Sequence, residues 1–212
     1  MEQGQEARLQ NKIYTPSLLD GPIRQGEIFS NLTQIKLDLD TIDSDKSRAN
    51  PVTHPFAIVV SQDCDLDWDY DSRKHQANAH RRIPSILFCE VDTANNMAKR
   101  IMEIEGSKNT DKSRRWSRIR VNKDERYQFL QKIIPEQDAL EIGIEELTID
   151  FKRYFTIPSD EIYVRIKQSE TKRRCRLLHP YLEHFASRFY YFQSRIALPE
   201  EHFSDPDKLK FD

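Results

Sequence analysis

Several short segments of the chain alternate between apolar and polar residues, which is the pattern of half-buried β-strands. Residues 26–32 begin this pattern, and residues 34–39 continue it with Ile35, Leu37 and Leu39 at every second position. Residues 56–60 read Phe-Ala-Ile-Val-Val, a continuous run rich in β-branched side chains that predicts a central strand. The same criteria predict an extended segment at 125–134 and strands at 83–91, 147–155 and 161–166.

Two segments show the helical period instead. Residues 95–105 place Met97, Ile101 and Met102 at helical spacing, and Gly106 is a stop signal. From Pro180 to Ile196 the apolar residues form a broad stripe that includes Phe185, Phe189 and Phe192. The pattern as a whole predicts an α+β protein that is mainly β, with the C-terminal helix packed on the core.

The length of 212 residues suits one substantial domain. Residues 1–22 are expected to form an N-terminal tail whose last part packs down, because Gly21-Pro22 punctuates the chain. A single domain is predicted over 23–198, with insertions at 66–82 and 93–124, followed by a C-terminal tail at 199–212. Residues 40–53 are predicted to be a polar loop.

Charges are segregated along the chain although they nearly cancel in the sum. The 33 Lys and Arg against 35 Asp and Glu leave a formal net charge of −2. Five aspartates alternate with other residues between Asp63 and Asp71, whereas basic residues gather at 108–126 and again at 165–176. Charge distribution bears on partners, so the two basic segments keep nucleic acid among the candidates.

Composition also bears on compartment. Aromatic residues make up 10% of the chain, which excludes a wholly disordered protein. No apolar run approaches the roughly 18 residues that span a bilayer, and no signal peptide is recognisable, so no membrane association is expected. Three cysteines do not make a disulfide framework, and the expected location is the cytoplasm.

The order of several short motifs resembles a known family. Gly26-Glu27-Ile28-Phe29 opens a strand, residues 54–61 read His-Pro-Phe-Ala-Ile-Val-Val-Ser, and strands at 86–92 and 147–162 follow. This order is similar to that of the MazF/PemK toxins, over about half of the chain. The resemblance implies a small SH3-like barrel as the core, with a helical insertion and a packed C-terminal helix.

The same resemblance implies metal-independent RNA cleavage, in which the 2′-hydroxyl attacks the adjacent phosphate. Ser61 matches the family's serine, His54 stands where the family has an arginine before proline, and Arg48 would be the loop cation. Asp63, at the end of the same strand, joins them as a candidate catalytic residue.

The acidic residues after the central strand permit other interpretations. Asp63 and Asp65, together with Glu90 and Asp92 at the end of the 83–91 strand, are the oxygen ligands that a divalent metal prefers. Such a site would make the protein a metal-dependent hydrolase. A second interpretation takes Cys64 as a nucleophile with His54 as its base. A third is structural, an edge strand with an acidic solvated face.

That structural interpretation packs Cys64, Leu66, Trp68 and Tyr70 inward. For zinc, the candidate ligands would be Cys89, Cys175, His179 and His184, of which Cys175 and His179 have a permissible spacing. No Cys-x2-Cys pair anchors such a site, and a buried strand cysteine is more typical of packing.

The first basic segment interleaves arginines with an indole. This combination suits phosphate contacts and base stacking on single-stranded nucleic acid, or docking of an acidic protein partner. A solvated insertion with the indole packed on the core is the structural alternative. The candidate residues are Arg114, Arg115, Trp116, Arg118 and Arg120, with Lys172, Arg173 and Arg174 as a second phosphate contact.

The favoured hypothesis is a non-catalytic or weakly catalytic accessory or effector module of a bacterial toxin–antitoxin or phage-defence system. It would bind nucleic acid, with RNA favoured, or a protein partner. Tyr190 and Tyr191 beside the C-terminal stripe leave surface for a homodimer or a heteromeric complex. A metal-independent endoribonuclease is the alternative, followed by the metal-dependent hydrolase. No cofactor other than that divalent metal is expected.

Overall fold

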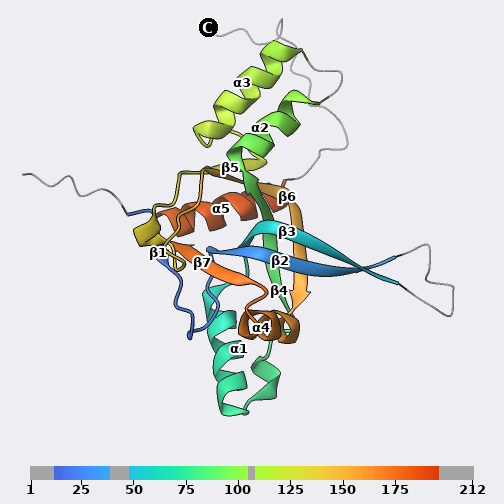
Figure 1. Cartoon of the computed structure of the whole chain (residues 1–212), viewed down its shortest axis with the longest axis vertical. Coiled ribbons are helices and arrows are strands. Elements are labelled where there is room, and N and C mark those ends of the chain that lie inside the picture. Colours follow the sequence, from blue (N-terminus) through green and yellow to red (C-terminus); the bar gives the residue numbers. More distant parts are fainter. Residues whose placement is uncertain (1–11, 39–47, 105–107, 196–212) are drawn as a thin grey trace, which may run out of the picture.

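The fold is built on one open antiparallel sheet (Figure 1). The structure, a computed structural model, describes residues 12–38, 48–104 and 108–195. Seven strands lie in the order β1-β7-β2-β3-β4-β6-β5. They are β1 (Tyr14–Pro16), β2 (Glu27–Leu37), β3 (Ala49–Val59), β4 (Ser85–Thr93), β5 (Tyr127–Leu130), β6 (Leu147–Pro158) and β7 (Lys172–Leu177).

The predicted barrel is wrong, although the predicted α+β class is confirmed. A barrel needs its first and last strands to pair, and in the described residues the short strands β1 and β5 stand at opposite edges of the sheet. Every neighbouring pair is antiparallel. β2 and β3 run on together beyond the rest of the sheet as a two-stranded ribbon (Figure 1).

Five α-helices accompany the sheet, and none in the described ranges has the length and apolar content to cross a bilayer. Figure 1 shows α2 and α3 together at one end of the molecule, and α1 and α4 at the other. The helices are α1 (Asp63–His75), α2 (Ala94–Met102), α3 (Asn109–Arg120), α4 (Ser159–Lys167) and α5 (Tyr181–Gln193), with 3-10 turns η2 (Ala79–Arg81) and η3 (Pro135–Gln137).

Two cores lie on opposite faces of the sheet because successive strand residues point to opposite sides. Ile58 packs in the core that includes the α5 phenylalanines, whereas Val59 packs in the core that includes Leu66 of α1 and Ile162 of α4. A third, smaller cluster joins α2, α3 and β5. The two strands predicted at 26–32 and 34–39 form the single strand β2, and the strands predicted at 56–60, 83–91 and 147–155 are confirmed. The helices predicted at 95–105 and 180–196 are confirmed in type over their described residues, whereas residues 39, 105 and 196 lie outside the described residues.

The acidic segment from Asp63 is a helix, so the predicted edge strand is wrong. α1 buries Leu66 and the carboxylate of Asp69, while Trp68 is 52% exposed. The charges of this segment favour a helix. The acids in its first turn, and Arg73 and Lys74 in its last turn, complement the helix dipole. The Asp69–Arg73 ion pair, at spacing i, i+4, fits a helix and not a strand.

The predicted strand at 161–166 is also wrong, since these residues belong to α4. Ile162, Val164 and Ile166 mimic a period of two, but only Ile162 is fully buried. Glu161 and Arg165 form an i, i+4 ion pair with an N–O distance of 2.8 Å.

The predicted tails fall partly outside the described residues. Tyr14–Pro16 pairs with β7 as β1, so the last part of the segment 1–22 packs down as expected. Residues 49–53 of the predicted polar loop belong to β3. Residues 1–11 and 40–47 and the predicted C-terminal tail 199–212 lie outside the described residues.

Candidate nucleic-acid interface

α3 separates its apolar residues from most of its arginines. With 3.6 residues per turn, Trp116 and Ile119 point to one side, where they pack with Met97, Ile101 and Tyr127. Arg114 and Arg118 lie on the opposite side and are exposed, whereas the half-buried Arg115 lies between the two sides. Burial of the first side therefore leaves the guanidinium groups of Arg114 and Arg118 on the second.

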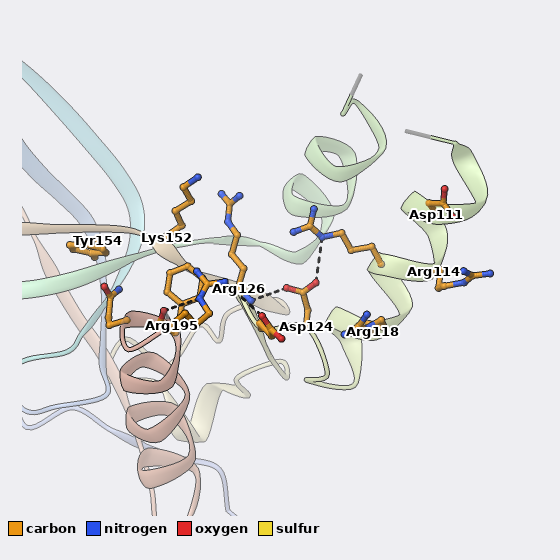
Figure 2. Close-up of a pocket in the computed structure, with 12 residues that line it drawn as sticks. Asp111, Arg114, Arg118, Asp124, Arg126, Lys152, Tyr154 and Arg195 are labelled. Carbon is orange, nitrogen blue, oxygen red and sulfur yellow. Dashed lines mark hydrogen bonds and ion pairs between the residues drawn. The ribbon is translucent and has the colours of Figure 1, made fainter. Parts of the chain in front are cut away.

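These three arginines line a cleft of about 1230 Å³, which we call the basic cleft (Figure 2). Its walls are α3 with the turn that follows it, the middle of β6 and the C-terminal end of α5. In Figure 2, Lys152 and Tyr154 lie on one side, Arg114 and Arg118 on the other, and Arg126, Asp124 and Arg195 between them. The lining residues are Asp111, Arg114, Arg115, Arg118, Asp124, Glu125, Arg126, Lys152, Tyr154, Phe192, Gln193 and Arg195.

Three of the cations have no carboxylate partner among the described residues. The guanidinium of Arg118 donates only to the carbonyl oxygen of Lys123, at 3.0 Å. The side chains of Arg114 and Lys152 form no hydrogen bond or ion pair with the described part of the chain. All three residues are exposed, so their charges are available to an anionic ligand.

Lys152 reaches the cleft because of an irregularity in β6. Cys89 of β4 pairs with Tyr154, but the next residue, Glu90, pairs with Asp150, which leaves residues 151–153 as an insertion. Phe151 is buried, whereas Lys152, Arg153 and Tyr154 are exposed in succession. Such bulges are common beside functional sites, where they redirect side chains.

Aromatic groups stand beside these cations. Tyr154 is 51% exposed, and its ring meets the ring of Phe189 at an interplanar angle of 89°. The guanidinium of Arg195 stacks over Phe192 at 3.7 Å from the ring centroid. A half-exposed phenol ring and a stacked guanidinium plane are surfaces on which an unpaired base can stack.

The cleft floor is held by paired arginines. Arg126 donates to both carboxylate oxygens of the buried Asp150, at 2.7 and 2.6 Å, and these hydrogen bonds raise the pKa of Arg126. The guanidinium groups of Arg115 and Arg126 lie 5.3 and 4.8 Å from the ring centroid of Tyr127. Asp124 lies 3.4 Å from Arg115. These residues fix the shape of the cleft more than they supply free charge.

The turn between α3 and β5 is braced from α5. Arg188 donates to the backbone carbonyl oxygens of Asn122 and Tyr127, at 2.5 and 2.9 Å, and to that of Asp124. Asn122 has a left-handed φ of 56°, and its side chain both donates to and accepts from the backbone of Phe129. The arginines of α3 are therefore mounted on a preorganised support.

Two predicted members of the interface lie elsewhere. Trp116 packs against the apolar cluster of α2, α3 and β5, which is the structural alternative for this residue. Arg120 lines a separate groove with Phe129 and Lys132 on the other side of α3. The five candidate residues of α3 thus divide into three at the cleft and two away from it.

Two residues of the predicted second phosphate contact, Arg173 and Arg174, are buried. Arg173 and Arg174 are only 4% and 5% exposed. Arg173 donates to both carboxylate oxygens of Glu27, at 2.6 and 2.9 Å, and Arg174 to both of Asp138, at 2.8 and 2.6 Å. Neither guanidinium is presented to a nucleic acid. Lys172, at the start of β7, is half-buried.

The predicted catalytic set does not assemble. Arg48 precedes and Ser61 follows the 11-residue strand β3, which at about 3.3 Å per residue separates them by roughly 35 Å. His54 is buried between them and stacks on Phe155 at a centroid distance of 3.9 Å. Burial lowers the pKa of His54 although Glu90 opposes it.

The remaining members of that set also have structural partners. The hydroxyl of Ser61 accepts the backbone N–H of Leu87 at 2.9 Å. Asp63 pairs with Arg176 and accepts the backbone N–H of Gln25 at 2.8 Å. Cys64 lies near Gln62 and Asp65, with no contact to His54 among those described.

The predicted metal sites are not formed by the described residues. No group of three or more His, Cys, Asp or Glu side chains in residues 12–38, 48–104 and 108–195 is arranged to hold an ion. Because β3 and β4 are antiparallel, Asp63 and Asp65 follow one end of this pair while Glu90 and Asp92 lie toward the other. Glu90 and Asp92 instead face Arg100, at 3.7 and 3.3 Å.

The zinc candidates are separated in the same way. Cys89 is on β4 and Cys175 on β7, with β2 and β3 between them. Burial raises the pKa of both thiols far above its ordinary value. His179 is exposed and pairs with Glu183 at 2.9 Å, while His184 lies on α5.

Four further residues of the cleft were not predicted from the sequence, namely Arg126, Lys152, Tyr154 and Arg195. A signal for two of them is present, because Lys-Arg-Tyr at 152–154 interrupts an otherwise apolar strand. Arg126 is the last residue of the basic segment 108–126, whereas Arg195 has no such signal, since the fold brings the end of α5 beside the chain after α3.

No model of a known protein family matches this chain, and no curated protein sequence is significantly similar to it. The resemblance to the MazF/PemK toxins therefore stays a prediction.

Proposed function

We propose that the protein binds single-stranded nucleic acid in the basic cleft. The observation that carries this proposal is the combination, in one concave site, of an exposed aromatic ring and cations that have no carboxylate partner within the described part of the chain. Arg114, Arg118 and Lys152 supply the free charge, and Tyr154 supplies the ring.

The cations account for affinity. Each phosphate that a lysine or arginine neutralises releases condensed counterions, and this release drives binding of any nucleic-acid sequence. Arg118 and Lys152 come from α3 and β6, on two walls of the cleft, so a strand that lies between them contacts both. Arg114 extends the charged wall along α3.

The aromatic groups favour a single strand over a duplex. Tyr154 and the Arg195–Phe192 stack offer planar surfaces to bases, and only unpaired bases expose their faces for stacking. RNA is favoured over DNA by the resemblance to RNA-cleaving toxins alone. A role in a bacterial toxin–antitoxin or phage-defence system stays a prediction.

A binding function fits the described residues better than cleavage. The residues that the resemblance assigns to catalysis are spread along β3, outside the basic cleft. The endoribonuclease alternative would need another catalytic set, and the metal-dependent alternative would need ligands other than the four carboxylates.

The test is a titration of fluorescently labelled oligonucleotides of about 12 nucleotides, a length within the range that single-strand-binding folds cover. Single-stranded RNA and DNA are compared with a duplex of the same sequence. The Arg118→Gln, Lys152→Gln double variant is expected to bind the single strands at least tenfold more weakly. Its matched control is Arg120→Gln, Lys132→Gln, which removes the same charge from the neighbouring groove.

Equal losses in the two double variants would contradict the proposal, because nonspecific attraction to overall charge would then suffice. Tighter binding of the duplex than of either single strand would also contradict it. Displacement of RNA by a glutamate-rich peptide, with the peptide bound more tightly than RNA, would instead identify the cleft as a docking site for an acidic protein.

A further inference from the structure

A second concave basic surface lies between α1 and α4, at the opposite end of the molecule from α3 (Figure 1). We call it the α1–α4 pocket; its volume is about 1000 Å³. None of its residues was predicted to bind a ligand. The charged residues that line it are Arg73, Lys74, Arg82, Asp160 and Lys167, beside Tyr70 and Tyr163.

Arg73 joins the elements that form the pocket, and its guanidinium is already paired with carboxylates of the protein. Its guanidinium donates to the buried carboxylate of Asp69 at 2.8 Å, to the carboxylate of Asp160 and to the hydroxyl of Ser159 at 2.9 Å. It also lies 5.0 Å from the ring centroid of Tyr163. These contacts join α1 to the start of α4 and neutralise the one acid that lines the pocket.

The other three cations have no carboxylate within ion-pair distance among the described residues. Arg82 donates to the hydroxyl and the carbonyl oxygen of Ser72, at 3.3 and 3.4 Å. Lys74 lies 5.9 Å from the ring centroid of Tyr70, and the ammonium of Lys167 has no described partner. They come from three separate elements, namely α1, the residue after η2 and the end of α4.

Cations spread over three elements suit a ligand that carries several phosphates more than a single small anion. A bidentate, convergent arrangement would favour one phosphate or carboxylate group. A chain of phosphates contacts separated cations one by one, as in nonspecific nucleic-acid binding.

The two basic surfaces are too far apart to share a short ligand. Lys152 of the basic cleft and Asp160 of the α1–α4 pocket are joined by the rest of β6, about 25 Å of strand at roughly 3.3 Å per residue. A second site would therefore hold a different segment of nucleic acid from the one in the basic cleft.

We propose that the α1–α4 pocket is a second binding site for the phosphate backbone of nucleic acid, so that one molecule holds two segments at once. The bridging of two segments rests on the proposed function of the basic cleft, whereas binding in the pocket does not.

The experiment mixes the full chain with two oligonucleotides of about 4 nucleotides, which are too short to occupy both surfaces at once, one labelled with a donor dye and one with an acceptor. Energy transfer between the dyes reports that one particle holds both strands, and sedimentation of the protein alone gives its oligomeric state. The pocket variant is Lys74→Gln, Arg82→Gln, Lys167→Gln. Its matched control is Lys99→Gln, Arg120→Gln, Lys132→Gln, which removes the same charge outside both sites.

The wild type and the control are expected to give energy transfer and to bind two strands per monomer. The pocket variant is expected to lose the transfer and bind one strand with the affinity of the cleft. The Arg118→Gln, Lys152→Gln variant is expected to keep one strand in the pocket. An unchanged unfolding midpoint in each variant excludes a loss of structure as the cause.

The outcomes separate the two proposals. Transfer that persists in the pocket variant would overturn the second site and attribute bridging to a dimer with two clefts. One strand per wild-type monomer would also overturn it. If the cleft variant binds like the wild type and the pocket variant binds nothing, the pocket stands and the proposed function of the cleft fails. A glutamate-rich peptide that displaces RNA only from the pocket would overturn the nucleic-acid assignment.

Discussion

Adjacent arginines occur in α3 and in β7, and the two pairs have opposite environments. Arg114 and Arg115 of α3 both line the basic cleft, where Arg114 is exposed and Arg115 is half-buried beside Asp124. Arg173 and Arg174 of β7 point to opposite faces of a strand that lies between β1 and β2, and both are buried. Adjacent arginines therefore indicate a binding surface only where the element that carries them leaves its charged side outside.

The buried pair organises the segments around β7. Arg173 collects Glu27 and the backbone carbonyl oxygens of Leu19, Gly21 and Pro22. Arg174 joins Asp138 and the carbonyl oxygen of Gly143 to the sheet. A fork of several N–H donors suits this task, because each guanidinium satisfies several acceptors at once. In β7, arginine acts as a structural crosslink and not as a free cation.

The largest expected effect follows from breaking one of these crosslinks. Arg174→Met leaves the Asp138 carboxylate, of which 0% is exposed, without its cation. Removal of one partner of a buried ion pair costs about 3–5 kcal/mol because the remaining charge stays desolvated. Urea unfolding at neutral pH measures this loss.

The matched control for that variant is Arg114→Met on α3. Arg114 is exposed and forms no ion pair with residues that the structure describes, so its replacement is expected to change the free energy of unfolding by no more than about 0.5 kcal/mol. Similar losses in the two variants would show that the arginines of β7 and α3 do not differ in environment.

The next effect concerns binding in place of stability. Arg118→Glu reverses the charge of a cation that has no carboxylate partner among the described residues. It is expected to weaken binding of single-stranded RNA at least about tenfold at low salt and to leave the unfolding midpoint unchanged. A fluorescence titration and a thermal melt on the same sample measure the two quantities. A lower unfolding midpoint without weaker binding would mean that Arg118, like Arg174, stabilises the fold and does not contact the nucleic acid.

The stability that the buried Arg174–Asp138 pair contributes is expected to depend on pH. Burial alone would raise the pKa of Asp138, but hydrogen bonds from Arg174 and from the backbone N–H groups of Leu140 and Gly143 outweigh it. They hold the pKa below its ordinary value of 3.8. A carboxyl with a lowered folded pKa stabilises the protein fully above its unfolded pKa, and this contribution is lost as pH falls through the folded value.

The wild type is therefore expected to exceed Asp138→Asn in stability at neutral pH, with a difference that shrinks below about pH 4. Urea unfolding at a series of pH values measures the difference. A gap that grows as the pH falls would mean that the pKa of Asp138 is raised and not lowered.

The smallest effect is expected from the arginine of α3 that faces away from the cleft. Arg120→Gln removes one charge from the groove that contains Lys132 and Phe129. Binding of RNA is expected to change by less than about twofold, because a charge outside the site acts only through the screened field of the protein. A loss as large as that of Arg118→Gln, measured in the same titration, would mean that the strand crosses α3 on its other side.

Much of the sheet was predictable because its strands obey local rules. The continuous run of Phe56 to Val60 and the alternation of Ile35 and Leu37 specify strands whatever their neighbours are. The stripe of Phe185, Phe189 and Phe192 likewise specifies α5. The open order of the strands was not predictable, because no local pattern states which strand lies beside which.

The errors arose where one pattern satisfies two periods. The alternating aspartates of α1 and the residues Ile162, Val164 and Ile166 of α4 fit a strand by apolar alternation. Their ion pairs at spacing i, i+4 were the signal for a helix. In a charged segment, weak apolar alternation is therefore poor evidence for a strand when charged side chains at spacing i, i+4 can pair in a helix.

The candidate site was half predictable. Three arginines of α3 were identified from a local mixture of charge and aromatic residues, but Trp116 turned out to be the apolar anchor of the helix. Burial of Arg173 and Arg174 depends on Glu27 and Asp138, which are distant in sequence. A count of basic residues cannot separate a charge that has found such a partner from one that remains free.

The salt dependence of binding tests the central claim most directly. The slope of log affinity against log salt concentration counts the phosphates that the protein neutralises, at about 0.7 per phosphate for a single strand. Removal of two cleft cations in Arg118→Gln, Lys152→Gln is expected to make the slope shallower by about 1.4, whereas Arg120→Gln, Lys132→Gln leaves it unchanged. The same slope in the wild type and both variants would contradict the assignment of the basic cleft as the nucleic-acid site.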